Sequence, residues 1–116
     1  MTTHELLQAA RDARTALLTA DAETKNRALL AMAQALLDRT GDILAANALD
    51  MDAARGTVSP VMLDRLALTP ERIRGMAEGV RQVAALPDPV GRVLSTAERP
   101  NGLLIRKVSV PMGVIA

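Results

Sequence analysis

The sequence contains no cysteine and no phenylalanine, tyrosine or tryptophan. Without cysteine it has no disulfide, no thiolate metal ligand and no cysteine nucleophile. Without aromatic side chains it has no surface on which nucleic-acid bases could stack. Its 14 basic and 13 acidic residues are interspersed, and the formal net charge is +1, so no basic stripe forms. We therefore expect no nucleic-acid partner.

Histidine is almost absent as well. His4 is the single histidine and lies in a polar N-terminal segment. With no His or Cys partner, we interpret it as a solvated side chain and predict no metal site. No apolar run approaches the roughly 18 residues of a membrane span. The N-terminus carries an acid early and lacks the apolar core of a signal peptide. These absences predict a cytoplasmic protein with no membrane partner.

What the sequence does contain is typical of a folded domain, with 49% hydrophobic and 23% charged residues. In its first three quarters, apolar residues recur at helical spacing. Thr3 is the expected N-cap of the first helix. The pattern predicts five helices, at residues 5–18, 22–39, 43–55, 61–66 and from 70 to just before Pro87.

Local signals indicate where these helices begin and end. Ser59 and Thr69 each precede a proline, which is the pattern of an N-cap followed by proline at the first helical position. Residues 40–42 (TGD) predict a break between the second and third helices, with Asp42 as the next N-cap. Gly56 is the expected end of the third helix.

After Gly91 the periodicity changes to that of strands. Residues 93–96 and 103–110 predict two strands, and residues 99–102 (RPNG) predict the hairpin turn between them. Residues 114–116 (VIA) then indicate the start of a further apolar strand. A domain seldom ends on an unpaired apolar strand, so we expect this sequence to be the front part of a larger α/β protein.

No catalytic constellation can be assembled from these residues. Asp50 and Asp52 are two apart on a predicted helix, so they point in different directions and indicate a solvated face. Gly91, Gly102 and Gly113 are too widely spaced for a phosphate-binding loop and are expected in turns. We therefore assign no catalytic, cofactor-binding or metal-ligating residue.

Asn47 is the one polar residue placed among apolar neighbours on a predicted helix. A partly buried amide must find hydrogen-bond partners, and the backbone of a neighbouring loop is favoured over a substrate. The methionines on the apolar stripes are predicted to fill the core. They are Met32, Met51, Met62 and Met76.

Five short sequence segments indicate a family, which composition alone does not. They run, in order, through residues 25–27 (KNR), 45–50 (AANALD), 62–73 (MLDRLALTPERI), 83–93 (VAALPDPVGRV) and 106–115 (RKVSVPMGVI). Together they closely resemble the γ-glutamyl phosphate reductases, also called glutamate-5-semialdehyde dehydrogenases, of the aldehyde dehydrogenase superfamily. The resemblance spans nearly the whole sequence.

The resemblance implies an aldehyde dehydrogenase-like α/β fold. Residues 1–91 are expected to form a helical N-terminal layer of the cofactor-binding domain. Residues 92–116 are expected to form a β-hairpin and the first strand leading into the Rossmann-like cofactor domain.

The resemblance also implies an activity for the full-length protein. Members use NADPH to reduce L-glutamyl 5-phosphate to L-glutamate 5-semialdehyde with release of phosphate, a step of proline biosynthesis. The full-length enzyme is expected to be a homo-oligomer. The family's catalytic cysteine lies beyond Ala116, so this segment alone is expected to be inactive.

Two alternatives remain open at this point. The sequence is also compatible with a free-standing helical module that offers its amphipathic stripes to a partner. A third interpretation is part of another aldehyde dehydrogenase that acts on a different substrate.

Overall fold

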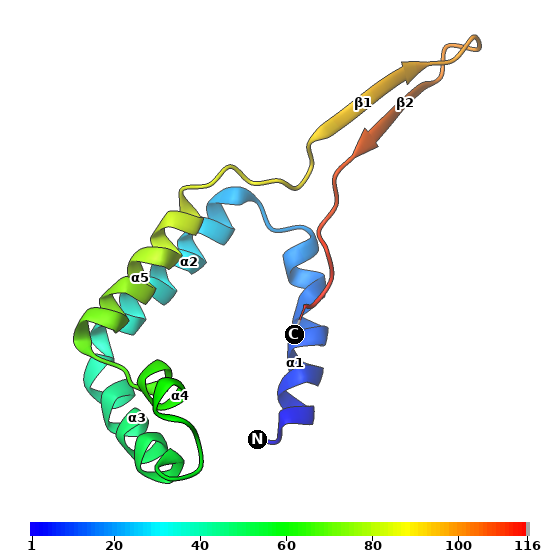
Figure 1. The fold of residues 1–116 in the computed structure, drawn as a ribbon. Helices are drawn as coiled ribbons and strands as arrows, with labels where there is room; N and C mark the ends of the chain where they lie inside the picture. Colours follow the sequence, from blue (N-terminus) through cyan, green and yellow to red (C-terminus); the bar gives the residue numbers. More distant parts are fainter. Residues whose placement is uncertain (116) are drawn as a thin grey trace. The chain divides into compact units, whose positions relative to one another are not determined.

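A computed structural model describes residues 1–115 of the chain. Five helices precede a two-stranded antiparallel hairpin (Figure 1). The elements are α1 (Thr3–Leu18), α2 (Ala22–Asp38), α3 (Thr40–Ala54), α4 (Pro60–Leu66), α5 (Pro70–Ala84), β1 (Val93–Glu98) and β2 (Leu104–Val108). The chain divides into two compact units. One consists of Met1–Ala22 with the chain from Pro87 onward, and the other is Glu23–Leu86.

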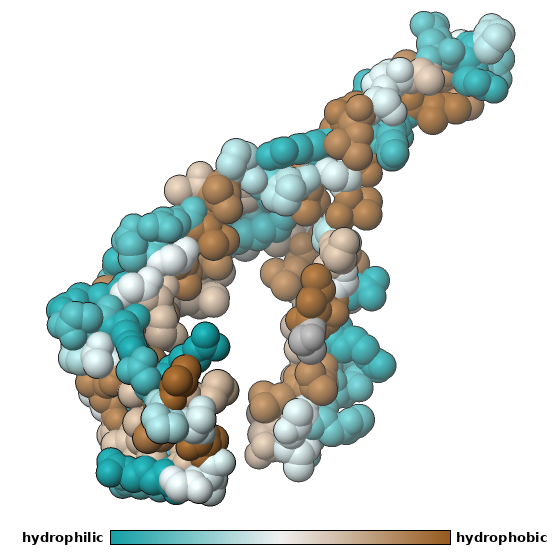
Figure 2. All heavy atoms as spheres, in the orientation of Figure 1, coloured by the Kyte–Doolittle hydropathy of each residue, from teal (hydrophilic) through white to brown (hydrophobic). Residues whose placement is uncertain are grey.

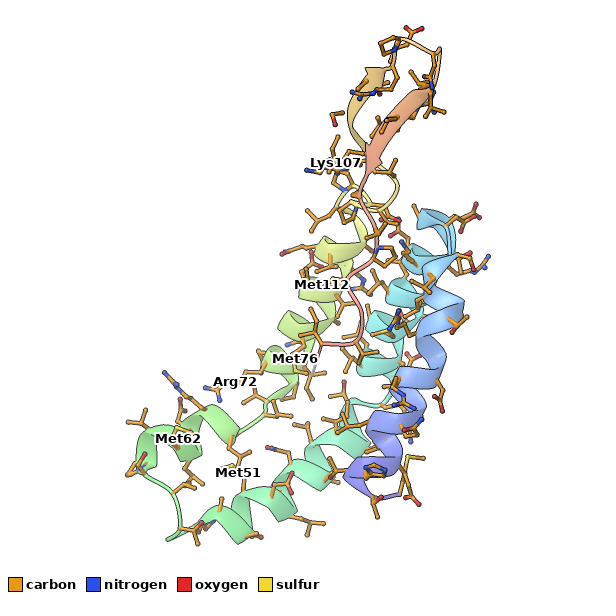
Figure 3. The ribbon with its side chains drawn as sticks, turned by 90° about the vertical axis from the view of Figure 1, so that its right-hand side faces the viewer. Met51, Met62, Arg72, Met76, Lys107 and Met112 are labelled. Carbon is orange, nitrogen blue, oxygen red and sulfur yellow. The ribbon has the colours of Figure 1, made fainter. Side chains whose placement is uncertain are left out.

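The Glu23–Leu86 unit contains the buried side chains. In it α2 and α5 run antiparallel and side by side, as Figures 1 and 3 both show. Ala33 of α2 and Ile73 and Ala77 of α5 are fully buried, and Ala84 is nearly so. Ile73, Ala77 and Ala84 recur at helical spacing on α5, as predicted for that helix, whereas Val83 of the same predicted stripe is 52% exposed.

The methionines differ from the prediction that they fill the core. Met32 is 55% exposed, Met62 52% and Met76 46%, and only Met51 is partly covered. Figure 2 shows apolar residues at the surface of the helices and along the hairpin. A helical stripe identifies the face that avoids water, but burial also requires a second element packed over that face. Among the described residues these methionines have too little packed over them.

Two of the predicted N-caps are confirmed. The Ser59 hydroxyl accepts a hydrogen bond from the Met62 amide at 3.3 Å, and proline follows at the first helical position. The Thr69 hydroxyl accepts one from the Arg72 amide at 3.1 Å in the same way. These caps are predictable because the cap and its donor are three residues apart in the sequence.

The cap of α1 lies one residue earlier than predicted. Thr2, rather than Thr3, accepts from the Glu5 amide at 3.3 Å, and its own amide donates to the Glu5 carboxylate at 2.6 Å. This reciprocal arrangement is a capping box, and it requires a glutamate or glutamine three residues after the cap. Glu5 satisfies that spacing only for Thr2.

The predicted break at residues 40–42 is wrong. α3 begins at Thr40, so Arg39 alone separates it from α2, and Asp42 is inside the helix instead of capping it. The Thr40 hydroxyl donates to the carbonyls of Leu36 and Leu37, at 3.1 and 2.8 Å. Because these bonds satisfy carbonyls at the end of α2, no glycine with positive φ is needed there. Gly41 is helical, whereas Gly56 has φ of +77° and ends α3 as predicted.

The hairpin forms where the sequence predicts it. The pairs run from Val93 opposite Val108 to Glu98 opposite Leu104, with an irregularity after Val93. Gly102 closes the turn with φ of +82°, and its amide donates to the Arg99 carbonyl at 2.8 Å. Every residue of both strands is exposed.

The further strand expected at residues 114–116 is not seen. Val114 and Ile115 have no regular secondary structure, and Ala116 is outside the described residues. A strand is defined by its pairing with a neighbour. Within residues 1–115, β1 and β2 pair with each other and no third strand is present.

Candidate functional site

The titratable residues weighed from the sequence lie on exposed helix faces. Over residues 1–115 no cluster of His, Cys, Asp or Glu could hold a metal ion. His4 is exposed on α1. Asp50 and Asp52 are exposed on α3, and Asp52 pairs with Arg55 at 3.3 Å. These positions agree with a solvated helix face. No helix in the described part of the chain has the length and hydropathy to cross a membrane.

Glu5 has a shifted pKa, and its carboxylate belongs to a helix cap. The backbone N–H of Thr2, together with the Thr2 hydroxyl, stabilises the Glu5 carboxylate and holds the pKa of Glu5 below its ordinary value of 4.5. Glu5 lies fully exposed in the first turn of α1. Its role is therefore to begin the helix.

Asn47 makes two hydrogen bonds to the backbone. It projects from α3 and is only 8% exposed. Its side-chain amide donates to the Leu66 carbonyl at 2.9 Å, and its oxygen accepts from the Leu68 amide at 2.8 Å. Both ends of the side chain therefore hold the α4–α5 connection. This is the structural role that the sequence favoured over substrate contact.

Arg72 holds the same connection from the other end. Its guanidinium bonds both carboxylate oxygens of Asp64 at 3.3 Å, and it donates to the backbone carbonyls of Asp64 and Ala67. Figure 3 shows Arg72 at the beginning of α5, beside the α4 helix that carries Met62. We refer to Asn47, Asp64, residues 66–68 and Arg72 as the loop clamp.

Most residues of the loop clamp belong to residues 62–73, the segment with the most specific resemblance to the reductases. Asp64 and Arg72 pair across it, Thr69 caps α5, and residues 66–68 bond to Asn47. Each of these residues fixes how α4 turns into α5. Sequence reasoning found Asn47, but nothing local to Arg72 indicates that its partners lie five to eight residues earlier.

The strongest candidate for a binding surface is an open groove in the Glu23–Leu86 unit, with a volume of about 530 Å³. Most of its lining is apolar. The two charged residues, Arg39 and Asp42, pair with each other at 3.3 Å and are both well exposed. We call it the apolar groove. It is lined by Met32, Ala35 and Leu36 of α2, Arg39 between α2 and α3, Asp42, Ile43 and Ala46 of α3, and Val80 of α5.

The apolar groove can bind apolar groups but supplies no reactive chemistry. Its two charged side chains neutralise each other, and the remaining lining residues carry no acid, base or nucleophile. Sequence reasoning missed it, because Met32 was assigned to a covered core. The available signal was the number of large apolar residues on α2 and α3 compared with the few that the chain buries.

The chain is similar in sequence and in structure to gamma-glutamyl phosphate reductases. Gamma-glutamyl phosphate reductase of Streptococcus pneumoniae (strain Hungary19A-6) is 61% identical over 97 residues, which are 84% of this chain and 23% of that protein. No protein-family model matches the chain.

Two crystal structures contain the same local fold. Gamma-glutamyl phosphate reductase from Thermotoga maritima superimposes with a TM-score of 0.86 and 38% identity, over 92% of this chain and 26% of that one. Gamma-glutamyl phosphate reductase from Saccharomyces cerevisiae superimposes with a TM-score of 0.81 and 31% identity, over 96% of this chain and 29% of that one. The chain thus spans about a quarter of the length of the relatives it matches.

Proposed function

Because the chain is homologous to the N-terminal part of the gamma-glutamyl phosphate reductases, we propose that it supplies the N-terminal helices and hairpin of such a reductase. The reaction is the NADPH-dependent reduction of L-glutamyl 5-phosphate to L-glutamate 5-semialdehyde with release of phosphate. The observation that carries the proposal is the 61% identity over 97 residues. The two superimposed reductase structures support it.

Within that enzyme, we propose a scaffolding role for this chain. Residues 1–91 form a helical layer of the cofactor-binding domain, and residues 92–116 lead from the hairpin into the Rossmann-like part. The loop clamp supports such a role, because the buried Asn47 amide and the Arg72 guanidinium both hold the connection between α4 and α5. Rigid secondary elements are what position a site that is built elsewhere.

The described residues do not fit NADPH. A dinucleotide needs backbone N–H groups at a glycine-rich turn for its phosphates. Here Gly91 and Gly102 serve the hairpin, and the apolar groove presents aliphatic side chains and a neutralised ion pair. We therefore propose that the described residues do not bind the cofactor. The cofactor and the acyl-phosphate chemistry are proposed to belong to the polypeptide that makes up the rest of the relatives.

The remaining assignments rest on the family alone. They are the choice of NADP, a homo-oligomeric and cytoplasmic full-length enzyme, and glutamyl phosphate as its small-molecule substrate. The absence of aromatic residues and of a basic stripe supports the expectation of no nucleic-acid partner.

A chimera tests the activity. In the Streptococcus pneumoniae reductase, the matched N-terminal part is replaced by this chain. Activity is measured in reverse, as NADP⁺ reduction with glutamate 5-semialdehyde and phosphate. We expect the chimera to be active and the 116-residue chain alone to be inactive.

A folded chimera that is inactive toward glutamate 5-semialdehyde would contradict the proposal. Activity with another aldehyde alone would favour the aldehyde dehydrogenase alternative. The same assay with NAD⁺ in place of NADP⁺ tests the choice of cofactor, and the unmodified Streptococcus pneumoniae reductase is the control.

A further inference from the structure

The chain matches about a quarter of the length of the gamma-glutamyl phosphate reductases. We propose that the apolar groove is a docking site for the remaining polypeptide of such a reductase. This inference rests on the proposed function, because it takes that polypeptide as the partner. It goes further by assigning the contact to one surface, formed by α2, α3 and α5 of the Glu23–Leu86 unit.

The first argument is the imbalance between buried and exposed apolar residues. Among residues 1–115, four hydrophobic residues are buried, and three of them are alanines. Large apolar side chains are left half-exposed, with Met32 at 55% in the groove itself. Contiguous exposed apolar surface of this kind marks an interaction site in a soluble protein.

The second argument is the chemistry of the groove. Its volume of about 530 Å³ can hold several aliphatic side chains. The Arg39–Asp42 pair at 3.3 Å is exposed to water and already neutral. An occupant therefore need not carry a compensating charge, and a burial-driven contact with a helix or strand of apolar character fits best.

The third argument identifies the occupant. The relatives are about four times as long as the matched region, and two of their crystal structures superimpose on this chain with TM-scores of 0.86 and 0.81. In such a protein the additional polypeptide is covalently tethered. Tethering gives it an effective concentration in the millimolar range, which a separate second copy does not have.

Methionine oxidation measures the occupancy of the groove. Met32 lines it at 55% exposure, and Met62 lies outside it on α4 at 52% exposure. Because oxidation follows exposure, dilute hydrogen peroxide should oxidise both at similar rates in the free 116-residue chain. In the chimera described above, we expect Met32 to be oxidised roughly tenfold more slowly than in the free chain.

A matched pair of variants tests the same surface without oxidation. Ala46 lines the groove and Ala45 does not, although both are exposed on α3 and both lie one turn after Asp42. In the chimera, Ala46→Glu should lower the midpoint of thermal unfolding by roughly 5 °C or more, because a carboxylate is forced into a covered apolar site. Ala45→Glu should change it little. In the free chain, circular dichroism should show equal helix content for both variants.

Several results would overturn the inference. One is Met32 being oxidised as fast in the chimera as in the free chain. Another is Ala46→Glu and Ala45→Glu having the same effect on the chimera. Protection of Met32 that rises with the concentration of the free chain would assign the groove to a second copy, and a chimera that cannot fold would show that the groove does not accept the reductase polypeptide.

The outcome also separates this inference from the proposed function. Protection of Met32 in a chimera without reductase activity would refute the proposed function and retain the docking site. Full reductase activity with Met32 unprotected would refute the docking site alone.

Discussion

Asn47 and Arg72 each connect parts of the chain that are distant in sequence. The amide of Asn47 bonds to residues 19 and 21 positions further along, and Arg72 bonds five and eight positions back. All of these bonds meet at the α4–α5 connection. A connection of three residues between two helices, residues 67–69, is thereby given one defined path.

Replacing Asn47 tests how much that path depends on a single side chain. Asn47→Ala leaves the Leu66 carbonyl and the Leu68 amide without their partner in a partly buried place. The expected loss of unfolding free energy is about 1–3 kcal/mol. Hydrogen exchange at the Leu68 amide should accelerate in parallel, as measured by NMR.

The matched control for this substitution is Gln34→Ala. Gln34 donates to Asp38 at 2.8 Å on the exposed face of α2. An exposed bond of this kind is expected to contribute within about 0.5 kcal/mol. Equal effects of the two alanines would show that Asn47 does not hold the connection.

Glu5 predicts a local dependence on pH. Its pKa is lowered in the folded chain by the bonds from Thr2, so the capping box stabilises α1 at pH values above the unfolded pKa of Glu5. That stabilisation is lost as pH falls through the lower, folded pKa. An NMR titration should give a Glu5 pKa below 4.5 and fraying of the first turn at lower pH.

The control for Glu5 keeps the shape and removes the charge. Glu5→Gln can still accept from the Thr2 amide, as in a capping box with glutamine, but it does not titrate. The first turn of α1 should then lose its pH dependence. Persistence of the same acid-induced fraying in that variant would exclude Glu5 as its cause.

At the scale of the elements, local signals decide what can be predicted from sequence. Ser59 and Thr69 place the beginnings of α4 and α5 correctly, since each cap acts over three residues and is followed by proline. The hairpin turn at Gly102 is equally local. The prediction of a break at residues 40–42 was wrong, because the Thr40 hydroxyl bonds to carbonyls at the end of α2 and α3 begins at Thr40.

Replacing glycine by alanine should change the stability in opposite directions at Gly79, which is helical, and at Gly102, which has a positive φ. Gly79 lies within α5, and a Cβ there meets nothing within 4 Å. Gly79→Ala should stabilise α5 by about 1 kcal/mol. Gly102 has φ of +82°, so Gly102→Ala should destabilise the hairpin by about 1–2 kcal/mol. Urea unfolding and NMR measure the two effects, and equal signs would contradict the assigned conformations.

At the scale of the whole molecule, burial is concentrated in one of the two units. Ala33, Asn47, Ile73, Ala77 and Ala84 all belong to the Glu23–Leu86 unit. Both strands of the hairpin, by contrast, are exposed along their length. Sequence periodicity correctly predicted the positions that α5 buries, which are Ile73, Ala77 and Ala84. It could not give the exposure of Met32, Met62 and Met76, because exposure depends on what is packed over a face.

This distribution predicts unequal protection from hydrogen exchange in the 116-residue chain. Amides in the middle of α5, around Ala77, should exchange roughly ten times or more slowly than the paired amides of β1 and β2, because local opening is easiest where little apolar surface is buried. Mass spectrometry after pulse labelling would measure this.

A free-standing interaction module makes a different prediction for the same measurement. It should unfold as one sharp transition, with similar protection in its helices and its hairpin. Such a result would favour that alternative over a scaffold that needs further polypeptide to complete its packing.

The position of Asn47 on α3 restricts where related proteins can carry insertions. Asn47 faces the α4–α5 connection, while Ile43 and Ala46 of the same helix line the apolar groove. One residue inserted between Ala46 and Asn47 would rotate one surface against the other by about 100°. An insertion in residues 55–58, after the helix ends, would leave both in register. Natural length variation should therefore be absent from α3 and permitted just after it.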